Sequence, residues 1–483
     1  MTRDATLPDP TDLDALRARL RVGEGEAPTT RRPIGLGRVR IQADALRHLG
    51  DDVAAVRGDG PVLVVVDETP MTRSGSDLKA LVIADLAARF ETTVATIKAP
   101  GSGLHADADA LAQADRAIAE SGAGCVVAVG SGTITDIAKD ASMRAGNLPF
   151  VVVQTAVSVN AFSDDMAVLL RDGVKRTVPS RWPDALLVDL EVIADAPAAM
   201  NRAGFGELCS MFTAPADWYL AGAVGLDPTY DDAVVGLFRD GAEGLLDGAA
   251  RVRQNDPEML AELASRMTLT GIAMGVAGRT APLSGTEHLL SHLLDMAAAA
   301  AGRELAFHGA QVGVASVLAA TLWQDTIERF DPARLASDAA FPAPDAVEPR
   351  VRAAFDPIDP SGRMADECWR DVSSKLERWR AARPRIEAFA DAWPRHRTAL
   401  ASMVAGPDAL RAALAASGSA ATLADLDPPA PPEIGRWALR SLPLMRDRFT
   451  VADLRFLTGE WDEAATDALL ARSGILGAIG VGS

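Results

Sequence analysis

Residues 125–136 read Cys-Val-Val-Ala-Val-Gly-Ser-Gly-Thr-Ile-Thr-Asp, and this stretch decides the expected fold. A short apolar run that ends in a glycine turn is typical of a buried parallel strand leading into a helix. Glycines let the backbone approach a ligand closely, and free N–H groups at a helix start favour a phosphate. The third glycine of the dinucleotide-binding fingerprint is missing, so a nicotinamide pyrophosphate, a phosphorylated substrate and a purely structural turn all fit.

The segments on either side of this stretch repeat the alternation of strand and helix. Strands are predicted at residues 39–41, 61–66, 92–97, 125–129, 150–154 and 186–188. Strands that alternate with helices indicate a parallel α/β sheet. Beyond residue 189 the pattern changes to long helices, predicted at residues 203–223, 231–253, 257–276, 285–301 and 310–329 and again after 365.

These patterns predict an α/β lobe followed by an all-helical lobe, with a boundary near residue 198. Residues 1–32 are expected to form a flexible extension around one short helix, residues 33–198 the α/β domain, and residues 199–483 the helical domain. The segment 332–362, which is rich in Pro, Asp and Ala, is predicted to be a loop or insertion.

Composition excludes several classes of protein. The chain has 483 residues, of which 48% are apolar and 24% charged, as in globular proteins. It has no apolar run near 18 residues and no apolar signal sequence, so membrane insertion and secretion are not expected. Three widely spaced cysteines favour a reducing compartment, hence a cytoplasmic protein. The net charge of −18 argues against nucleic acid as a partner.

Three of the six histidines lie within 21 residues, at His288, His292 and His308. Positions i and i+4 share one face of a helix, so His288 and His292 are expected to point the same way. Glu207 lies in the first turns of a mainly apolar helix, where a carboxylate usually complements the helix dipole. If Glu207 meets two of these imidazoles, the set becomes a catalytic zinc or iron site. Three ordinary half-buried histidines remain the alternative.

Six motifs in this order resemble the sn-glycerol-1-phosphate dehydrogenases. That family belongs to the superfamily of iron-containing alcohol dehydrogenases, glycerol dehydrogenases and 3-dehydroquinate synthases. The motifs are GSGTITDIAKDAS (130–142), QTAVSVNAFSDDM (154–166), GFGELCSMFTAPADWYLA (204–221), SGTEHLLSHLLDM (284–296), FHGAQVGVAS (307–316) and MRDRFTVADL (445–454).

The resemblance implies a dehydroquinate synthase-like fold, in which a Rossmann-like α/β lobe binds NAD or NADP and a helical lobe binds metal and substrate. It implies one divalent metal ion, zinc with iron or nickel as alternatives, held by Glu207, His288 and His308. His292 and Asn160 match positions that contact the substrate. The matched cofactor-binding positions are Asp67, Gly130, Ser131, Gly132, Thr133, Asp136, Thr155, Ser158 and Ser163.

Two positions depart from the family pattern. Asn160 stands where the family has an Asp that contacts substrate, which keeps the shape and hydrogen-bonding capacity but loses the charge. Glu207 stands where most members have Asp as the metal ligand. The 3-dehydroquinate synthases use Glu at this place, but the chain lacks their Gly-Gly-Lys-Thr-Gly loop.

The resemblance therefore implies an oxidoreductase that interconverts dihydroxyacetone phosphate and sn-glycerol 1-phosphate by hydride transfer. Its partner would be a small phosphorylated polyol or ketone, and a homo-oligomer is expected. Three alternatives stay open: a related polyol or polyol-phosphate dehydrogenase with another substrate, a cyclase or lyase of the same fold that uses NAD transiently, and a member without catalysis that serves in binding or assembly.

Overall fold

The structure, a computed structural model, describes residues 7–21, 30–99, 103–171 and 174–477. Their contacts divide the chain into two compact units. The first contains the described parts of Met1–Gly204 together with Ala233–Gly244 and Arg251–Arg279, and the second contains Phe205–Asp232, Leu245–Ala250 and the described part of Thr280–Ser483. The first unit therefore includes a helix far beyond residue 198, α12 (Pro257–Ala277).

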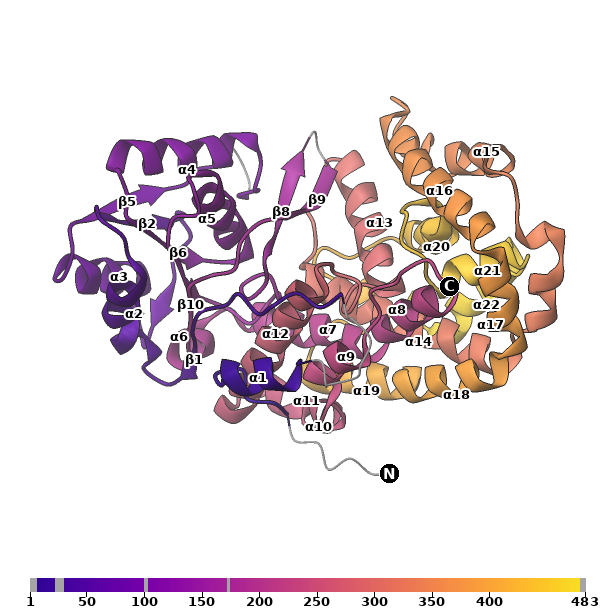
Figure 1. Ribbon diagram of the computed structural model, residues 1–483, viewed down its shortest axis with the longest axis horizontal. Coiled ribbons are helices and arrows are strands. Elements are labelled where there is room, and N and C mark those ends of the chain that lie inside the picture. The colour runs from indigo at the N-terminus through magenta and orange to yellow at the C-terminus, as the bar shows by residue number, and fades with distance from the viewer. Residues whose placement is uncertain (1–6, 22–29, 100–102, 172–173, 478–483) are drawn as a thin grey trace, which may run out of the picture. The chain divides into compact units, whose positions relative to one another are not determined.

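A parallel six-stranded sheet forms the centre of the first unit (Figure 1). Its strand order is β1-β10-β7-β6-β2-β5, and every neighbouring pair is parallel. The central strands are buried on both faces, which is why their sequences are continuous apolar runs rather than alternating ones. The predicted α/β class is confirmed, with strands β1 (Val39–Gln42), β2 (Val62–Val66), β5 (Thr92–Thr96), β6 (Cys125–Gly130), β7 (Phe150–Gln154) and β10 (Ala185–Asp189).

Helices cover both faces of this sheet. α4 (Ala108–Ser121) and α5 (Gly132–Arg144) pack side by side on one face, and α2 (Leu49–Val56) and α3 (Leu78–Ala87) lie on the other (Figure 1). Sequence reasoning missed two antiparallel hairpins, formed by β3 (Thr72–Arg73) with β4 (Ser76–Asp77) and by β8 (Met166–Arg171) with β9 (Val174–Pro179).

Part of the expected N-terminal extension is folded. Helix α1 (Leu13–Arg19) buries Leu13 and Leu16, and the Arg17 side chain donates a hydrogen bond to the Leu36 carbonyl at 3.0 Å. The short helix predicted in the extension is therefore present and packed. The remaining parts of the extension at residues 1–6 and 22–29 lie outside the described residues.

The second unit is helical, and every strand formed by the described residues belongs to the first unit. Its central helix is α14 (His308–Arg329), which is buried along most of its length and contacts α13 (Thr286–Ala300). None of the described helices combines the length and apolar character needed to cross a membrane. α14 also contacts α18 (Trp393–Met403), α19 (Pro407–Ser417), α21 (Val451–Leu457) and α22 (Glu463–Ser473). The unit further contains α8 (Ala214–Ala223), α15 (Pro344–Phe355), α16 (Arg363–Ala381), α17 (Arg383–Asp391) and α20 (Pro432–Ser441).

Three predicted segments differ from the structure. The helix expected at 203–223 is broken, because α7 (Ala198–Leu208) and a 3₁₀ turn end at Thr213, whose φ and ψ of −138° and −48° are not helical. The helix expected at 231–253 divides into α9 (Asp232–Arg239), α10 (Glu243–Asp247) and α11 (Ala249–Arg253). The loop expected at 332–362 contains α15, whose Pro344 stands at the helix start, where proline is favourable.

The backbones of α7 and α14 approach each other closely where they cross. A Cβ atom added to Gly206 would lie 2.3 Å from the carbonyl oxygen of Gly309, and one added to Gly313 would lie 2.9 Å from the Cα of Gly206. Only glycine fits such an approach. The contact brings together the residues adjacent to these glycines, Glu207 and His308.

We predict that Gly206→Ala destabilises the protein by about 2 kcal/mol or more, because the new methyl group must displace backbone atoms of α14. Urea unfolding followed by circular dichroism measures this change. Gly244→Ala is the matched control, since Gly244 is an exposed helical glycine with open space around it. There alanine should be neutral or slightly stabilising. An unchanged unfolding midpoint for Gly206→Ala would contradict the close crossing.

Candidate active site

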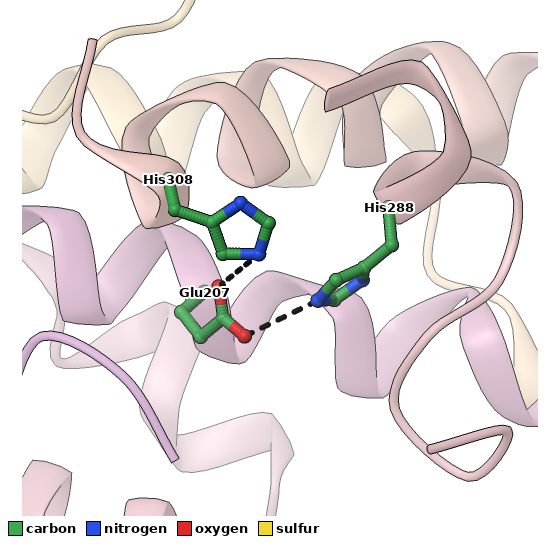
Figure 2. A group of neighbouring side chains, drawn as sticks. All are labelled: Glu207, His288 and His308. Atoms are coloured by element: carbon green, nitrogen blue, oxygen red, sulfur yellow. Dashed lines mark hydrogen bonds and ion pairs between the residues drawn. The ribbon is translucent and has the colours of Figure 1, made fainter. Parts of the chain in front are cut away.

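Three side chains from three helices point toward one another in the second unit (Figure 2). Glu207 Oε1 lies 3.2 Å from His288 Nε2, and Glu207 Oε2 lies 3.8 Å from His308 Nε2. One ligand atom from each of the three lies within 4.8 Å of the others. Atoms bound by a single tetrahedral zinc ion at about 2.1 Å lie about 3.4 Å apart, so the set has the spacing and the donor chemistry of a metal site.

The electrostatics of this cluster favour a cation. Glu207 and His288 are buried and His308 is half-buried. Burial alone would lower the pKa of His288, but the carboxylates of Glu207 and Glu287 outweigh it and raise that pKa to about 9. Burial would raise the pKa of Glu207, yet the two imidazoles hold it below its usual value. A metal ion would take the place of the positive charge that a proton supplies here.

The orientation of His288 is fixed by a carboxylate behind it. His288 Nδ1 lies 3.0 Å from Oε1 of Glu287, which is completely buried. Glu287 also accepts hydrogen bonds from the Gly285 amide at 2.6 Å and the Thr213 hydroxyl at 2.8 Å. Because an ionised carboxylate only accepts, Nδ1 carries the hydrogen and Nε2 is left to face Glu207.

His308 is oriented by a different chain of hydrogen bonds. The Ser291 hydroxyl donates to Gln311 Oε1 at 2.7 Å, so it is available to accept a hydrogen bond from His308 Nδ1 at 3.1 Å. The Gln311 amide in turn donates to Asp295 at 3.1 Å. His308 Nε2 therefore also faces the cluster. Sequence reasoning missed these supporting residues, because spacing along the chain does not show which side chains meet between two helices.

His292 lies beside the three candidate ligands but is not one of them. Its ring centre is 6.5 Å from that of His288 and 5.8 Å from that of His308, and its side chain is half-buried. It is thus close enough to contact a molecule bound at the cluster. The assignment of different roles to His288 and His292 stays a prediction.

The glycine turn between β6 and α5 lies in the first unit, where the sequence predicted it. Ser131 occupies the N-cap position, yet its side chain makes no capping hydrogen bond to the described residues. The N–H groups of the first turn, at Gly132, Thr133 and Ile134, precede the first intrahelical bond and point outward from the helix. A Cβ atom on Gly132 would lie 2.9 Å from Val159, so the turn packs directly against the loop that carries Asn160. Such a cradle fits a pyrophosphate.

Asp136 lies beneath this turn rather than on its rim. It is buried, and burial raises the pKa of its carboxyl group to about 8. The same interior region contains Lys139, which is completely buried and forms an ion pair with Asp164 at 2.7 Å. A contact from Asp136 to a cofactor stays a prediction. Because its side chain is buried, Asp136 is better placed to support the start of α5 than to touch a ligand itself.

The loop at residues 155–163 is held from several sides. Lys139 Nζ donates to the carbonyls of Ala161 at 2.6 Å and Met166 at 2.8 Å, and the Ser163 hydroxyl donates to the Thr268 carbonyl at 3.0 Å. Thr155, Ser158 and Ser163 are buried in this loop. Asn160 is half-buried, on a loop that the protein holds in place.

Asp67 follows the last residue of β2, at the carboxyl end of the sheet strands, as predicted. Its carboxylate accepts hydrogen bonds from Lys79 Nζ at 2.6 Å and from the Thr69 hydroxyl at 2.8 Å. Ligands of open parallel sheets bind at this end of the strands. The position therefore suits contact with a nucleotide.

Known proteins match both parts of the chain. Residues 40–197 match the family described as iron-containing alcohol dehydrogenase. The solved maleylacetate reductases from Agrobacterium tumefaciens and Rhizobium sp. are each 16% identical, cover 93% of this chain and 98% of their own, and align with TM-scores of 0.54 and 0.55. These structures show the fold. The chain thus falls in the class of iron-containing alcohol dehydrogenases. The dehydroquinate synthase-like fold predicted from the sequence is confirmed.

Curated relatives narrow the family. The glycerol-1-phosphate dehydrogenase (NAD(P)+) of Haloquadratum walsbyi is 32% identical over 287 residues, which are 57% of this chain and 77% of that protein. The enzyme of the same name from Bacillus licheniformis is 29% identical over 63% of this chain and 75% of its own length. The match to the Halalkalibacterium halodurans relative, at 34% identity, spans about half of that protein (49%). The chain belongs to the glycerol-1-phosphate dehydrogenase family, whose members are NAD(P)-dependent oxidoreductases, and the predicted family and enzyme class are confirmed.

We predict that His288→Ala removes bound divalent metal, because it deletes one of three ligand atoms. His292→Ala should retain the metal, since that ring lies outside the cluster. Metal content after loading and desalting, measured by atomic emission, tests the difference. Equal loss of metal from the two variants would contradict the separate roles.

A second prediction concerns Glu287→Gln, which keeps the size of the side chain but removes the charge that orients His288. The dissociation constant for zinc should rise about 10- to 100-fold, as found for partners of metal-bound histidines. Competition with a chromophoric chelator measures it. Glu304→Gln is the control, because Glu304 is exposed in the segment between the two histidine helices. An unchanged zinc affinity for Glu287→Gln would show that His288 does not depend on this carboxylate.

Proposed function

We propose that this protein is a metal-dependent, NAD(P)-linked dehydrogenase that interconverts dihydroxyacetone phosphate and sn-glycerol 1-phosphate. The observation that carries the proposal is the cluster of Glu207, His288 and His308, whose nitrogen and oxygen atoms converge on one point. The names of the curated relatives support the choice of substrate.

Each side chain of the cluster has a defined task in this proposal. Glu207 and the Nε2 atoms of His288 and His308 hold a divalent ion, zinc being the best match to two imidazoles and one carboxylate. When bound, the ion would stabilise charge on the substrate oxygen as a Lewis acid, and the nicotinamide would supply or accept the hydride. Glu287 and Ser291 keep the two imidazoles turned toward this point.

His292 is proposed to contact the substrate and to pass the proton between the substrate oxygen and water. An imidazole suits this task, because this group both accepts and donates protons, and the partial exposure of His292 gives a path to solvent. Its position beside both candidate ligands puts it next to any molecule held at the cluster.

The first unit is proposed to bind the cofactor. The N–H groups at the start of α5 bind the pyrophosphate, and Asp67 accepts a hydrogen bond from a ribose hydroxyl. Thr155, Ser158 and Ser163 line the loop that packs against the turn. Asn160, on the same loop, orients a substrate hydroxyl through an amide that both donates and accepts.

Asn160 also supports a second candidate, a related polyol or polyol-phosphate dehydrogenase with another substrate. A carboxylate at this place accepts two hydrogen bonds from a diol and repels a nearby phosphate, whereas an amide does neither to the same degree. The loss of charge thus permits a substrate whose anionic group lies closer to this loop.

Turnover of the zinc-loaded protein tests the proposal. With dihydroxyacetone phosphate, oxidation of NADH or NADPH should appear as a fall in absorbance at 340 nm and should be lost on chelation. Unphosphorylated dihydroxyacetone is the matched control and should react at least about tenfold more slowly in kcat/KM, since a phosphate contact is worth more than 1.4 kcal/mol. A protein that binds metal and cofactor but oxidises neither nucleotide would contradict the proposal, and faster turnover of the unphosphorylated ketone would favour the second candidate.

A further inference from the structure

Lys79 occupies an unusual position for a lysine, in the first turn of α3 at the carboxyl end of β2. Its ammonium group donates to three oxygens at 2.6 Å: the carboxylate of Asp67, the carbonyl of Asp67 and the carbonyl of Thr69. An ammonium group has three N–H donors, so all of them are used. The side chains of Lys79 and Asp67 are only 14% and 11% exposed.

The position is electrostatically unfavourable for a cation on its own. The first turn of a helix carries a partial positive charge, which favours acids rather than lysine. The carboxylate of Asp67 compensates for this, and its second oxygen accepts the Thr69 hydroxyl at 2.8 Å. Lys79 and Asp67 therefore form a closed, neutral pair at the place where the fold presents an acid to the nucleotide.

A neutral lysine–aspartate pair and an unpaired carboxylate differ in which group on the ribose can bind beside them. In dinucleotide-binding folds, an acid at the end of this strand accepts a hydrogen bond from the 2′-hydroxyl of NAD, while the 2′-phosphate of NADP requires a nearby cation. A carboxylate has about four acceptor sites, so Asp67 keeps capacity for a hydroxyl after bonding Lys79 and Thr69. Its charge, however, is cancelled by an ammonium group in direct contact.

We propose that Lys79 sets the cofactor preference of this protein: by neutralising Asp67, it lets the adenosine ribose site accept the 2′-phosphate of NADP as well as the free 2′-hydroxyl of NAD. The inference rests on the proposed function, in that Asp67 lies against the ribose. It assigns the discrimination between the two cofactors to a residue that does not itself need to touch NAD.

A merely structural Lys79 would behave differently. By its contacts to two carbonyl groups it also ties the turn at residues 67–69 to α3. If that were its only role, its removal would weaken both cofactors by the same factor. The ratio of the two dissociation constants therefore separates the roles, while either constant alone does not.

Isothermal titration calorimetry of the zinc-loaded protein with NAD+ and NADP+ provides the test, and it needs no catalysis. Lys79→Met should weaken NADP+ about tenfold or more relative to NAD+, because Asp67 is then an uncompensated charge near the 2′-phosphate. Asp67→Asn should shift the ratio the other way. The double variant restores a neutral pair and should return the ratio to within about threefold of wild type. The ratio for Lys79→Met should move back toward wild type in 0.5 M salt, because salt screens the repulsion.

Lys98→Met is the control for a general loss of positive charge. Lys98 and Glu68 form an exposed pair at 3.8 Å near the same end of the strands, with side chains 69% and 66% exposed. Exposed pairs of this kind contribute little, so this variant should keep the wild-type ratio. Equal weakening of both nucleotides by Lys79→Met, or a double variant that keeps the altered ratio, would overturn the inference and leave the proposed function standing. A wild-type protein that binds neither nucleotide would overturn both.

Discussion

The close crossing of α7 and α14 is the constraint on which the candidate metal centre depends. Helices that pack through ordinary side chains lie about 8–10 Å apart. Here Gly206 and Gly313 remove the side chains at the point of contact, and a methyl group on Gly206 would collide with the carbonyl oxygen of Gly309. Glu207 follows Gly206 in the sequence, and His308 precedes Gly309. The glycines therefore position the carboxylate and the imidazole, and the geometry of the candidate metal centre follows from a packing requirement.

The strands were predictable because their physical cause is local. A parallel strand covered on both faces must be apolar throughout, and residues 62–66, 125–130 and 150–154 show this directly. The breaks within the helical region were not predictable in the same way. The apolar spacing of a helix continues through Thr213, and only the tertiary structure shows that the backbone turns there. At 332–362, the proline-rich composition predicts a loop, although Pro344 starts a helix.

The candidate site is likewise predictable from the sequence only in part. The ordered motifs predict the three candidate ligands, and the structure brings one ligand atom of each within 4.8 Å of the others. The groups that orient them are not identifiable, since Glu287 acts on the residue next to it and Ser291 on a residue 17 positions away in another helix. Asp136 shows that a motif can also suggest a contact that the burial of the side chain does not favour. Its place in a glycine-turn motif suggests a surface contact, while the structure buries it with Lys139 and Asp164.

Glu207 lies far along the chain from the two histidines of the cluster, and its sequence separation from His288 is 81 residues. An ion held between them closes a long loop without a covalent bond, and closing a long loop removes conformational entropy from the unfolded chain. Because such an ion would bind the folded state alone, its concentration would become a variable in the folding equilibrium. With an ion bound at this cluster, the stability of the second unit would therefore follow the supply of metal in its surroundings.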